Sequence, residues 1–327
     1  MRAVILAAGF GTRLWPLTED RTKPAIPFLN RPLISYSVEY LVSHSITDII
    51  INLHHQPDSI RRALEDGSRF GARIQYSLEE QILGTSGALD KVRDRLLDYD
   101  FVVMNGKVVT DIDLGLAIRV HREREAIATL VLQPNPARQQ FSIVETDDRG
   151  RITRFGRLPA PVSGVSGERG GETGDAPLMF TGIQVLSPRI LEYVPRGRFS
   201  HSTIDVYPRA IEAGELVLGH IAPGDWYELS TLDRYLAASL ALMGKRGQRI
   251  VMGAGCTLAD GAQVEESVLW ERVTVGSGAK VRRSVLADRV RIPPGVSIEG
   301  SVVVRRDTVS DLERGEVVGE NVVVPIG

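Results

Sequence analysis

Close to its start, the chain reads Leu6-Ala7-Ala8-Gly9-Phe10-Gly11-Thr12-Arg13-Leu14, a glycine-rich loop at the end of an apolar run. The apolar residues predict a buried strand over 3–8. The loop is not a dinucleotide fingerprint, because Leu14 stands where the third glycine belongs, and no Gly-Lys-Ser/Thr follows as in a P-loop. Its glycines instead let backbone amides approach an anion closely.

Two cations accompany this loop. Arg13 carries a planar, permanently charged donor fork, and Lys23 is followed by Pro24, which restrains the backbone. Backbone amides with two cations suit a nucleoside triphosphate whose α-phosphorus is attacked, because negative charge builds on the leaving pyrophosphate. Taken alone, a Gly-x-Gly loop favours an ordinary tight turn, so the prediction depends on the rest of the chain.

Outward from this loop, strand and helix patterns alternate. Strands are predicted at 3–8, 48–53, 73–77, 101–104 and 127–132, and helices at 33–44, 57–66 and 87–97. This alternation predicts an α/β domain with a mostly parallel, Rossmann-like sheet and helices on both faces. In such sheets ligands bind beyond the carboxyl ends of the strands, where the Gly9 loop and the turn Asn105-Gly106 both fall.

The α/β pattern is interrupted once and ends near residue 243. Residues 156–177 are rich in Gly, Pro, Ser and Glu, which predicts a mobile insert. The pattern resumes at Phe180 and closes with a helix over 231–243, after which residues 244–247 are predicted to form a linker. The predicted domains are therefore 1–243 and 244–327.

The tail repeats with a period of 17 residues. Four columns keep this spacing through three repeats: Gly261, Gly278 and Gly295; Ser267, Ser284 and Ser301; Val264, Val281 and Ile298; and Leu258, Val275 and Ile292. Such a repeat predicts a solenoid of short strands that stacks branched side chains into ladders. Its internal spacing near six resembles the left-handed parallel β-helix of hexapeptide-repeat proteins. An ordinary β-sandwich is the alternative.

The composition excludes several classes of protein. The 327 residues carry a formal net charge of −2 and are 43% hydrophobic, which indicates a soluble globular protein without the basic surface that nucleic acid requires. The one cysteine, Cys256, allows no internal disulfide and no zinc cluster. No apolar segment is long enough for a transmembrane helix, and the first one is too short for a signal peptide. We therefore expect a cytoplasmic protein without nucleic-acid or membrane partners.

Longer motifs indicate a family. The string from Leu6 to Thr18, with Lys23-Pro24 and Pro32-Leu33-Ile34, closely resembles the signature of sugar-1-phosphate nucleotidyltransferases. Further motifs that resemble this family follow in order: Gly84-Thr85-Ser86-Gly87-Ala88-Leu89, Asn105-Gly106, Phe180-Thr181-Gly182-Ile183, Asp205-Val206-Tyr207-Pro208 and Trp226-Tyr227-Glu228. The resemblance covers the chain to about Met243, and a β-helix tail is a common appendage in the family.

The resemblance implies a reaction in which a sugar 1-phosphate oxygen attacks the α-phosphorus of an NTP in line and releases pyrophosphate. It implies that Arg13 and Lys23 are catalytic. The implied nucleotide-binding residues are Leu6, Ala8, Gly9, Gly11, Thr12, Gln81, Gly84, Thr85, Asn105, Gly106 and Lys107. Those implied at the sugar phosphate are Ser142, Arg157 and Gly182, and Glu228 is the implied ligand of a Mg²⁺ cofactor.

Three positions depart from the family pattern. Lys107 stands where the family has a metal-binding Asp, and Glu228 stands where it has a second one. An ammonium repels Mg²⁺, whereas the carboxylate of Glu228 still offers oxygen ligands. Leu158 occupies the position of a lysine that contacts the sugar phosphate in the family, and Arg157 could supply that charge.

Asp111 and Asp113 follow Lys107 closely in the sequence, but we favour a role in capping the helix that begins at Leu114 over a role in a metal site.

Three hypotheses remain for the function of the altered site. The favoured one is an active nucleotidyltransferase in which Lys107 neutralises phosphate charge directly. The second is a catalytically impaired homologue that binds nucleotide or nucleotide sugar and regulates a partner. The third is an engineered Asp→Lys change at position 107 that traps an inactive state.

The substrate prediction compares two branches of the family. The stretch 22–28 resembles the branch that forms ADP-glucose, whereas the length and the β-helix tail resemble enzymes that form GDP-mannose. We predict GTP and mannose 1-phosphate, with glucose 1-phosphate and dTTP, UTP or ATP as the alternative. The tail after Gly244 contains no histidine, which argues against an acyltransferase of the hexapeptide class. We expect the β-helix to serve subunit packing in a homo-oligomer.

Overall fold

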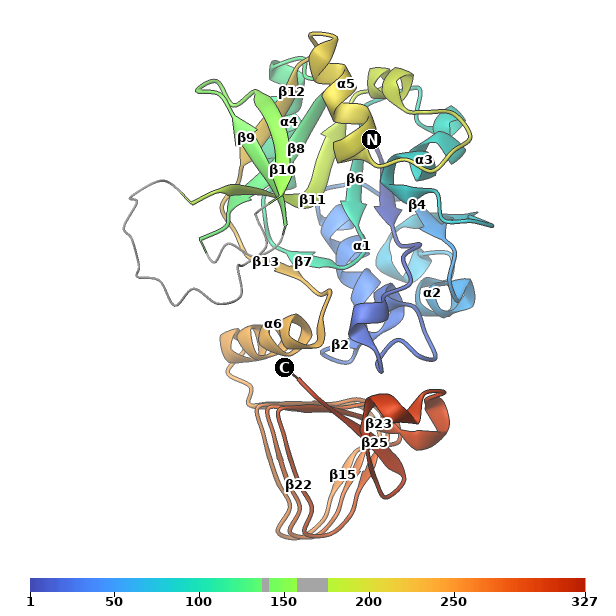
Figure 1. Cartoon of the computed structure of the whole chain (residues 1–327), viewed down its shortest axis with the longest axis vertical. Helices are drawn as coiled ribbons and strands as arrows, with labels where there is room; N and C mark the ends of the chain where they lie inside the picture. Colours follow the sequence, from blue (N-terminus) through green and yellow to red (C-terminus); the bar gives the residue numbers. More distant parts are fainter. Residues whose placement is uncertain (137–140, 158–175, 327) are drawn as a thin grey trace.

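The computed structural model describes residues 1–136, 141–157 and 176–326. It contains an α/β unit followed by a stack of short strands that forms the other end of the molecule (Figure 1). The helix α6 (Leu232–Lys245) lies between the two. Within the described residues, no helix combines the length and the apolar character needed to cross a bilayer.

A nine-stranded sheet forms the centre of the α/β unit. Its first half is parallel, because β1 pairs in parallel with β4 and β6, and β4 pairs in parallel with β5. Beyond β6 the sheet is mostly antiparallel, since β11 runs against β6, β8 and β9. The strands are β1 (Arg2–Leu6), β4 (Asp48–Leu53), β5 (Arg73–Leu78), β6 (Phe101–Asn105), β8 (Ala128–Pro134), β9 (Ser142–Thr146), β10 (Ile152–Arg157), β11 (Leu178–Leu186) and β12 (Val217–Ile221). The parallel-rich, Rossmann-like α/β prediction is confirmed.

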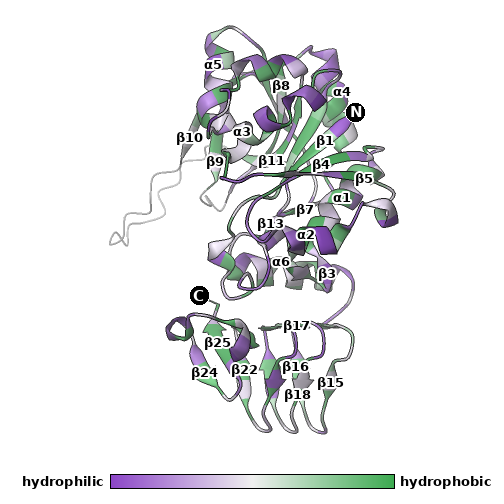
Figure 2. Cartoon of the chain, turned by 90° about the vertical axis from the view of Figure 1, so that its right-hand side faces the viewer, coloured by the Kyte–Doolittle hydropathy of each residue, from purple (hydrophilic) through white to green (hydrophobic). Residues whose placement is uncertain are grey.

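Helices cover both faces of this sheet, which explains why its central strands β1, β4 and β6 are buried along nearly their whole length. In β1, Ala3 and Ile5 join one buried cluster and Val4 joins the other, as the alternation of side chains along a strand requires. Residues of α1, α2 and α4 complete the first cluster, and residues of α3 and α5 complete the second. Figure 2 shows the apolar strands β1, β4 and β11 at the centre of the unit. The helices are α1 (Leu33–Ser43), α2 (Pro57–Leu64), α3 (Gly84–Lys91), α4 (Leu114–Glu123) and α5 (Tyr207–Glu212).

The 17-residue repeat folds as a parallel β-helix with three walls. Each wall pairs a strand with the strand 17 residues later, so Leu258 lies beside Val275 and Val275 beside Ile292. The strands of the walls are β14 (Ile250–Met252), β17 (Ser267–Leu269), β20 (Val285–Leu286) and β23 (Ser301–Arg305); β15 (Thr257–Leu258), β18 (Thr274–Val275) and β21 (Arg291–Ile292); and β16 (Gln263–Glu265), β19 (Lys280–Arg282) and β22 (Ser297–Glu299). This register confirms the solenoid and rules out the β-sandwich alternative.

The chain closes the last coil with an element that the repeat did not predict. β25 (Asn321–Pro325) pairs antiparallel with β23 on one side and with β24 (Glu316–Val318) on the other. The serine column lies inside the coils, where each backbone N–H donates to the serine hydroxyl of the preceding coil: Ser284 to Ser267, and Ser301 to Ser284, both at 3.1 Å. These bonds explain why a small hydroxyl side chain recurs there.

Contacts from α6 and from two loops of the α/β unit to the β-helix join the two parts of the chain. The indole Nε1 of Trp270 donates to the hydroxyl of Tyr235 at 3.2 Å, and Asn30 donates to the carbonyl of Leu269 at 3.0 Å. Arg21 forms an ion pair with Asp288 at 2.8 Å. Tyr235 and Trp270 are both buried. The β-helix is therefore packed against the α/β unit over several elements.

Several predicted boundaries are wrong. The helix α3 spans Gly84–Lys91 rather than 87–97. It begins at Gly84 because this residue adopts a φ of +76° and the amides of the first turn donate to the carbonyl of Ser200, and it ends before a short 3₁₀ turn (Arg93–Arg95). The helix α6 continues to Lys245, so the predicted linker at 244–247 starts inside it. The predicted insert at 156–177 starts inside β10, and its residues 158–175 lie outside the described residues.

Candidate functional site

The carboxyl ends of β1 and β6 bring the Gly9 loop and the Asn105-Gly106 turn together. The strands pair in register with Leu6 beside Asn105, and the N–H of Gly106 donates to the carbonyl of Leu6 at 3.0 Å. A Cβ atom on Gly106 would lie only 3.0 Å from Ile5 Cγ2, so glycine allows this close approach. The predicted meeting of the two loops is confirmed.

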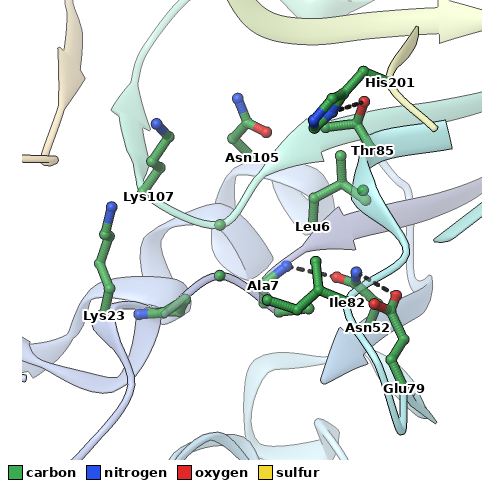
Figure 3. Close-up of a pocket in the computed structure, with 15 residues that line it drawn as sticks. Leu6, Ala7, Lys23, Asn52, Glu79, Ile82, Thr85, Asn105, Lys107 and His201 are labelled. Carbon is green, nitrogen blue, oxygen red and sulfur yellow. Dashed lines mark hydrogen bonds between the residues drawn. The ribbon is translucent and has the colours of Figure 1, made fainter. Parts of the chain in front are cut away.

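A pocket of about 250 Å³ opens at this edge of the sheet (Figure 3). Nine of the residues that the family resemblance implied line it: Leu6, Ala8, Gly9, Lys23, Gly84, Thr85, Asn105, Gly106 and Lys107. In Figure 3 the two lysines lie on one side of the pocket, and Ile82 and Glu79 lie on the other. The pocket therefore has a cationic end and an end formed by Ile82 and buried polar groups.

The polar groups at the second end form a chain of hydrogen bonds that the sequence analysis missed. The N–H of Ala7 donates to Asn52 Oδ1 at 2.6 Å, and Asn52 Nδ2 donates to Glu79 Oε1 at 2.8 Å. The other carboxylate oxygen of Glu79 accepts from the N–H of Leu83 at 3.0 Å. Glu79 is only 2% exposed, so the chain fixes the backbone on both sides of the pocket.

His201 and Pro24 also line the pocket without having been predicted. Asn52 could have been found, because it lies near the carboxyl end of β4, which is the parallel neighbour of β1. His201 offers no such signal. It lies at the start of a π-helical segment (Ser202–Val206), and its Nδ1 lies 3.5 Å from Thr85 Oγ1.

Four predicted residues do not line the pocket, namely Gly11, Thr12, Arg13 and Gln81. Thr12, Arg13 and Gln81 are exposed. Gly11 has a structural reason to be glycine, since its φ is +73° and a Cβ atom there would meet Lys23 Cβ at 2.9 Å. Gly11 does not line the pocket, so its position does not support the prediction that it contacts nucleotide. The absence of a side chain at Gly11 instead lets the loop pack closely against Lys23.

The loop itself offers free amides. Within the described part of the chain, no protein oxygen accepts from the backbone N–H groups of Gly9, Phe10 and Gly11. A Cβ atom on Gly9 would find no heavy atom within 4 Å, which leaves open space over the loop. Unpaired amides beside open space and cations favour an anionic ligand.

Lys23 is the cation whose electrostatics are most altered. It begins a 3₁₀ turn (Lys23–Ala25), with Pro24 in the first turn. Burial, together with the charges of Lys107 and Arg13, lowers the pKa of Lys23 to about 8, against the attraction of Glu228. Two ammonium groups in one pocket repel each other, so an anion bound between them would relieve this repulsion.

Lys107 is held by a network beneath the pocket. The strand β13 (Trp226–Glu228) pairs with β7 (Val108–Thr110), which places Glu228 next to Lys107. Lys107 Nζ donates to Glu228 Oε1, while Glu228 Oε2 accepts from Ser230 Oγ at 2.5 Å and from Arg234 at 2.7 Å. Burial would raise the pKa of the Glu228 carboxyl, but Lys107, Ser230 and Arg234 outweigh it and the pKa is lowered.

This donor set does not fit the predicted Mg²⁺ ligand. Both oxygens of Glu228 already accept from cationic donors, and unit charges of like sign about 4 Å apart repel by roughly 4 kcal/mol at a surface-like dielectric. Asp113 instead caps α4, as predicted, by accepting from the N–H of Leu116 at 3.2 Å. Asp111 is not part of the cap, since it accepts from the N–H of Asp225. The described residues contain no cluster of three His, Cys, Asp or Glu that could hold a metal.

A second pocket, of about 270 Å³, adjoins the first. Both are lined by Leu6, Thr85, Asn105 and His201, and the second adds Ser142, Phe180, Gly182, Gln184, Ser202, Thr203 and Ile204. Ser142 and Gly182 were implied at the sugar phosphate. Arg157 ends β10, but its side chain and Leu158 lie outside the described residues.

Comparisons with known proteins match both parts of the chain. A family model for nucleotidyl transferases matches residues 2–244, and a model for the GlmU-like C-terminal hexapeptide matches residues 228–324. The UTP–glucose-1-phosphate uridylyltransferase of Synechocystis is 31% identical over 258 residues, which are 75% of this chain and 64% of that protein. This chain thus spans less than two thirds of that relative.

One further relative and one solved structure are also similar to this chain. The mannose-1-phosphate guanylyltransferase of Mycobacterium tuberculosis is 27% identical over 301 residues, which are 83% of this chain and 80% of that protein. A Bacillus anthracis crystal structure described as a glucose-1-phosphate thymidylyltransferase with a sucrose superposes with a TM-score of 0.63 at 22% identity, covering 74% of this chain and 94% of that one. The last comparison shows the fold alone.

The first family match spans the whole sheet and every residue that lines the two adjoining pockets. The second spans the three-walled β-helix. This chain therefore belongs to the nucleotidyl transferase family of enzymes.

Proposed function

We propose that this protein transfers a nucleotidyl group from an NTP to a sugar 1-phosphate, giving a nucleotide sugar and pyrophosphate. The observation that carries the proposal is the pair of adjoining pockets, one with two lysines and a free-amide loop and one with Ser142 and Gly182. An NTP in the first pocket and a sugar phosphate in the second would meet at the shared residues, among them Leu6 and Asn105.

The reaction requires the protein mainly to position the two substrates and to neutralise negative charge. A sugar phosphate monoester is mostly ionised at neutral pH, because the second pKa of a phosphate is about 6, so its oxygen needs no general base. The attacking oxygen forms a bond to the α-phosphorus as the bond to the β-phosphate oxygen breaks. Lys23 and the Gly9 loop would neutralise the charge on the departing pyrophosphate.

For the substrates we propose GTP and mannose 1-phosphate. The Mycobacterium tuberculosis relative supports this choice, since 80% of its length is covered. The Synechocystis relative supports UTP and glucose 1-phosphate as the alternative. A thermal-shift panel of nucleotides and nucleotide sugars ranks the ligands, and pyrophosphate release from pairs of NTP and sugar 1-phosphate then tests the reaction. Retained nucleotide binding without turnover in any pair would contradict the proposal. The predicted Mg²⁺ requirement stays a prediction that the same assay tests.

One observation favours a second candidate, a catalytically impaired homologue that binds nucleotide and regulates a partner. Lys107 occupies the family's metal position and is tied to Glu228. Absent turnover in this chain, with turnover gained in Lys107→Asp, would support this candidate or the engineered-substitution hypothesis over the active enzyme.

The oligomeric state and the cellular location of the protein are proposals that rest on the sequence. We propose that the β-helix packs against a second copy of the chain, and light scattering on the full chain gives the mass that checks it. A mass of one chain at working concentration would contradict the homo-oligomer. A cytoplasmic location and the absence of nucleic-acid and membrane partners stay predictions.

A further inference from the structure

Lys107, which pairs with Glu228, has the opposite charge to the metal-binding Asp that the family has at this position. Glu228 is buried, with 8% of its surface exposed, and accepts hydrogen bonds on both carboxylate oxygens. Ser230 and Arg234 hold one oxygen and Lys107 the other. A carboxylate bonded in this way is already neutralised by the protein, and a divalent ion would have to displace a cation to reach it.

The backbone also holds Lys107 in place at the wall of the pocket. Its carbonyl accepts from the N–H of Leu229 at 3.1 Å, and the β7–β13 pairing fixes the turn that carries it. An ammonium has three N–H donors, of which Glu228 takes one. Lys107 lines the pocket with Lys23 and the Gly9 loop. Two donors therefore remain for the oxygens of a ligand at the cationic end.

We infer that the ammonium of Lys107, positioned by Glu228, takes the place of a divalent ion at the polyphosphate site, so that this chain binds polyphosphate without a metal held by the protein. The inference deepens the proposed function and rests on it for its role in turnover. In that reaction the electron pair of the broken bond stays on the pyrophosphate oxygen, which accepts a hydrogen bond from Lys107. No proton or electron is supplied from elsewhere. Lys107 is a catalytic residue in this account, and Glu228 is a positioning residue.

The first test measures binding of inorganic pyrophosphate by calorimetry in the presence of EDTA. We expect the unsubstituted chain to bind pyrophosphate without metal, and Lys107→Met to bind it at least about tenfold more weakly, as expected for loss of a charge-assisted hydrogen bond. Lys280→Met is the matched control, because Lys280 is exposed on β19 of the β-helix, and it should bind as the natural chain does. Pyrophosphate binding that requires Mg²⁺, or that Lys107→Met leaves unchanged, would overturn the inference.

The second test measures binding of Mn²⁺ alone through the electron paramagnetic resonance signal of the free ion. We expect no Mn²⁺ uptake by the natural chain and new uptake by Lys107→Asp, which would pair a second carboxylate with Glu228. One Mn²⁺ bound by the natural chain and lost in Glu228→Gln would show that Glu228 is a metal ligand, and would overturn the inference.

Two variants keep the test decisive if Lys107→Met does not fold. Lys107→Arg retains the cation and should keep binding of pyrophosphate in EDTA. Glu228→Gln still accepts a hydrogen bond from Lys107 and should weaken that binding without creating a need for metal. A Mg²⁺ requirement in either variant would contradict the inference. Failure of turnover with every substrate pair, while these binding results hold, would refute the proposed function and leave the polyphosphate site standing.

Discussion

Polyphosphate affinity should fall with rising pH, and Lys23 is the group responsible. Its pKa is lowered to about 8 by burial and by the neighbouring charges of Lys107 and Arg13. A bound polyanion stabilises the ammonium form, so the pKa of Lys23 is higher in the complex than in the free protein. Binding therefore takes up a proton, and it does so over the range from about pH 8 upward.

The size of the effect follows from this pKa. At pH 8 about half of the free molecules carry a neutral Lys23, so binding takes up about half a proton. Above pH 8 the uptake approaches one proton, and affinity falls by up to about tenfold per pH unit. The same pKa predicts that the free energy of unfolding rises between about pH 8 and pH 10.5, because the unfolded chain binds more protons there. The gain amounts to roughly 3 kcal/mol at most.

The assay is calorimetric titration with pyrophosphate at pH 8 in two buffers with different heats of ionisation. The difference between the two heats gives the number of protons taken up. Lys23→Arg is the matched variant, because arginine stays charged over this range, and it also cancels the ionisation of pyrophosphate itself. Equal proton uptake by the natural chain and by Lys23→Arg would refute the assignment to Lys23.

Two further predictions concern packing. Gly182→Ala should weaken binding of a sugar 1-phosphate at least about tenfold, because its Cβ atom would lie 2.2 Å from Asn105 Nδ2 and displace that side chain from the pocket. Gly197→Ala is the control, because Gly197 also has a positive φ, +62°, but no atom within 4 Å of a Cβ. An equal loss of binding in Gly197→Ala would contradict the clash as the cause. Tyr235→Phe should lower the free energy of unfolding by about 2 kcal/mol in denaturant titration, because its buried hydroxyl makes two hydrogen bonds. Tyr193→Phe, which loses one 3.4 Å bond, should change it much less, and equal losses would count against the argument.

Local patterns explain most of what could be predicted. The Gly9 loop follows an apolar strand, and the parallel sheet brings every such loop to the same edge, so its meeting with Asn105-Gly106 was predictable. The 17-residue period became the β-helix register without change, because each coil contacts only its neighbours. The antiparallel strand β25 lies outside the 17-residue repeat, so the repeat did not predict it.

The residues that prediction missed come from distant segments. Glu79 and Asn52 act through a hydrogen-bond chain that exists only when β4 and β1 are in register. Arg13 was assigned to the site from its charge and from the family resemblance; it is exposed and does not line the pocket, but its charge acts on Lys23, and its catalytic role stays a prediction. Charge and residue type do not specify direction, which depends on the backbone around them.

The sequence by itself determined the family, the sheet edge that carries the phosphate loop, and the coil repeat, because each depends on residues close together in the chain or on a strict period. It also revealed that position 107 carries the wrong charge for a metal ligand. Only the tertiary structure decided what that lysine does, since its partner Glu228 lies 121 residues away and reaches it through the β7–β13 pairing. Pairing between strands so far apart depends on how the whole domain packs, and no local pattern encodes it.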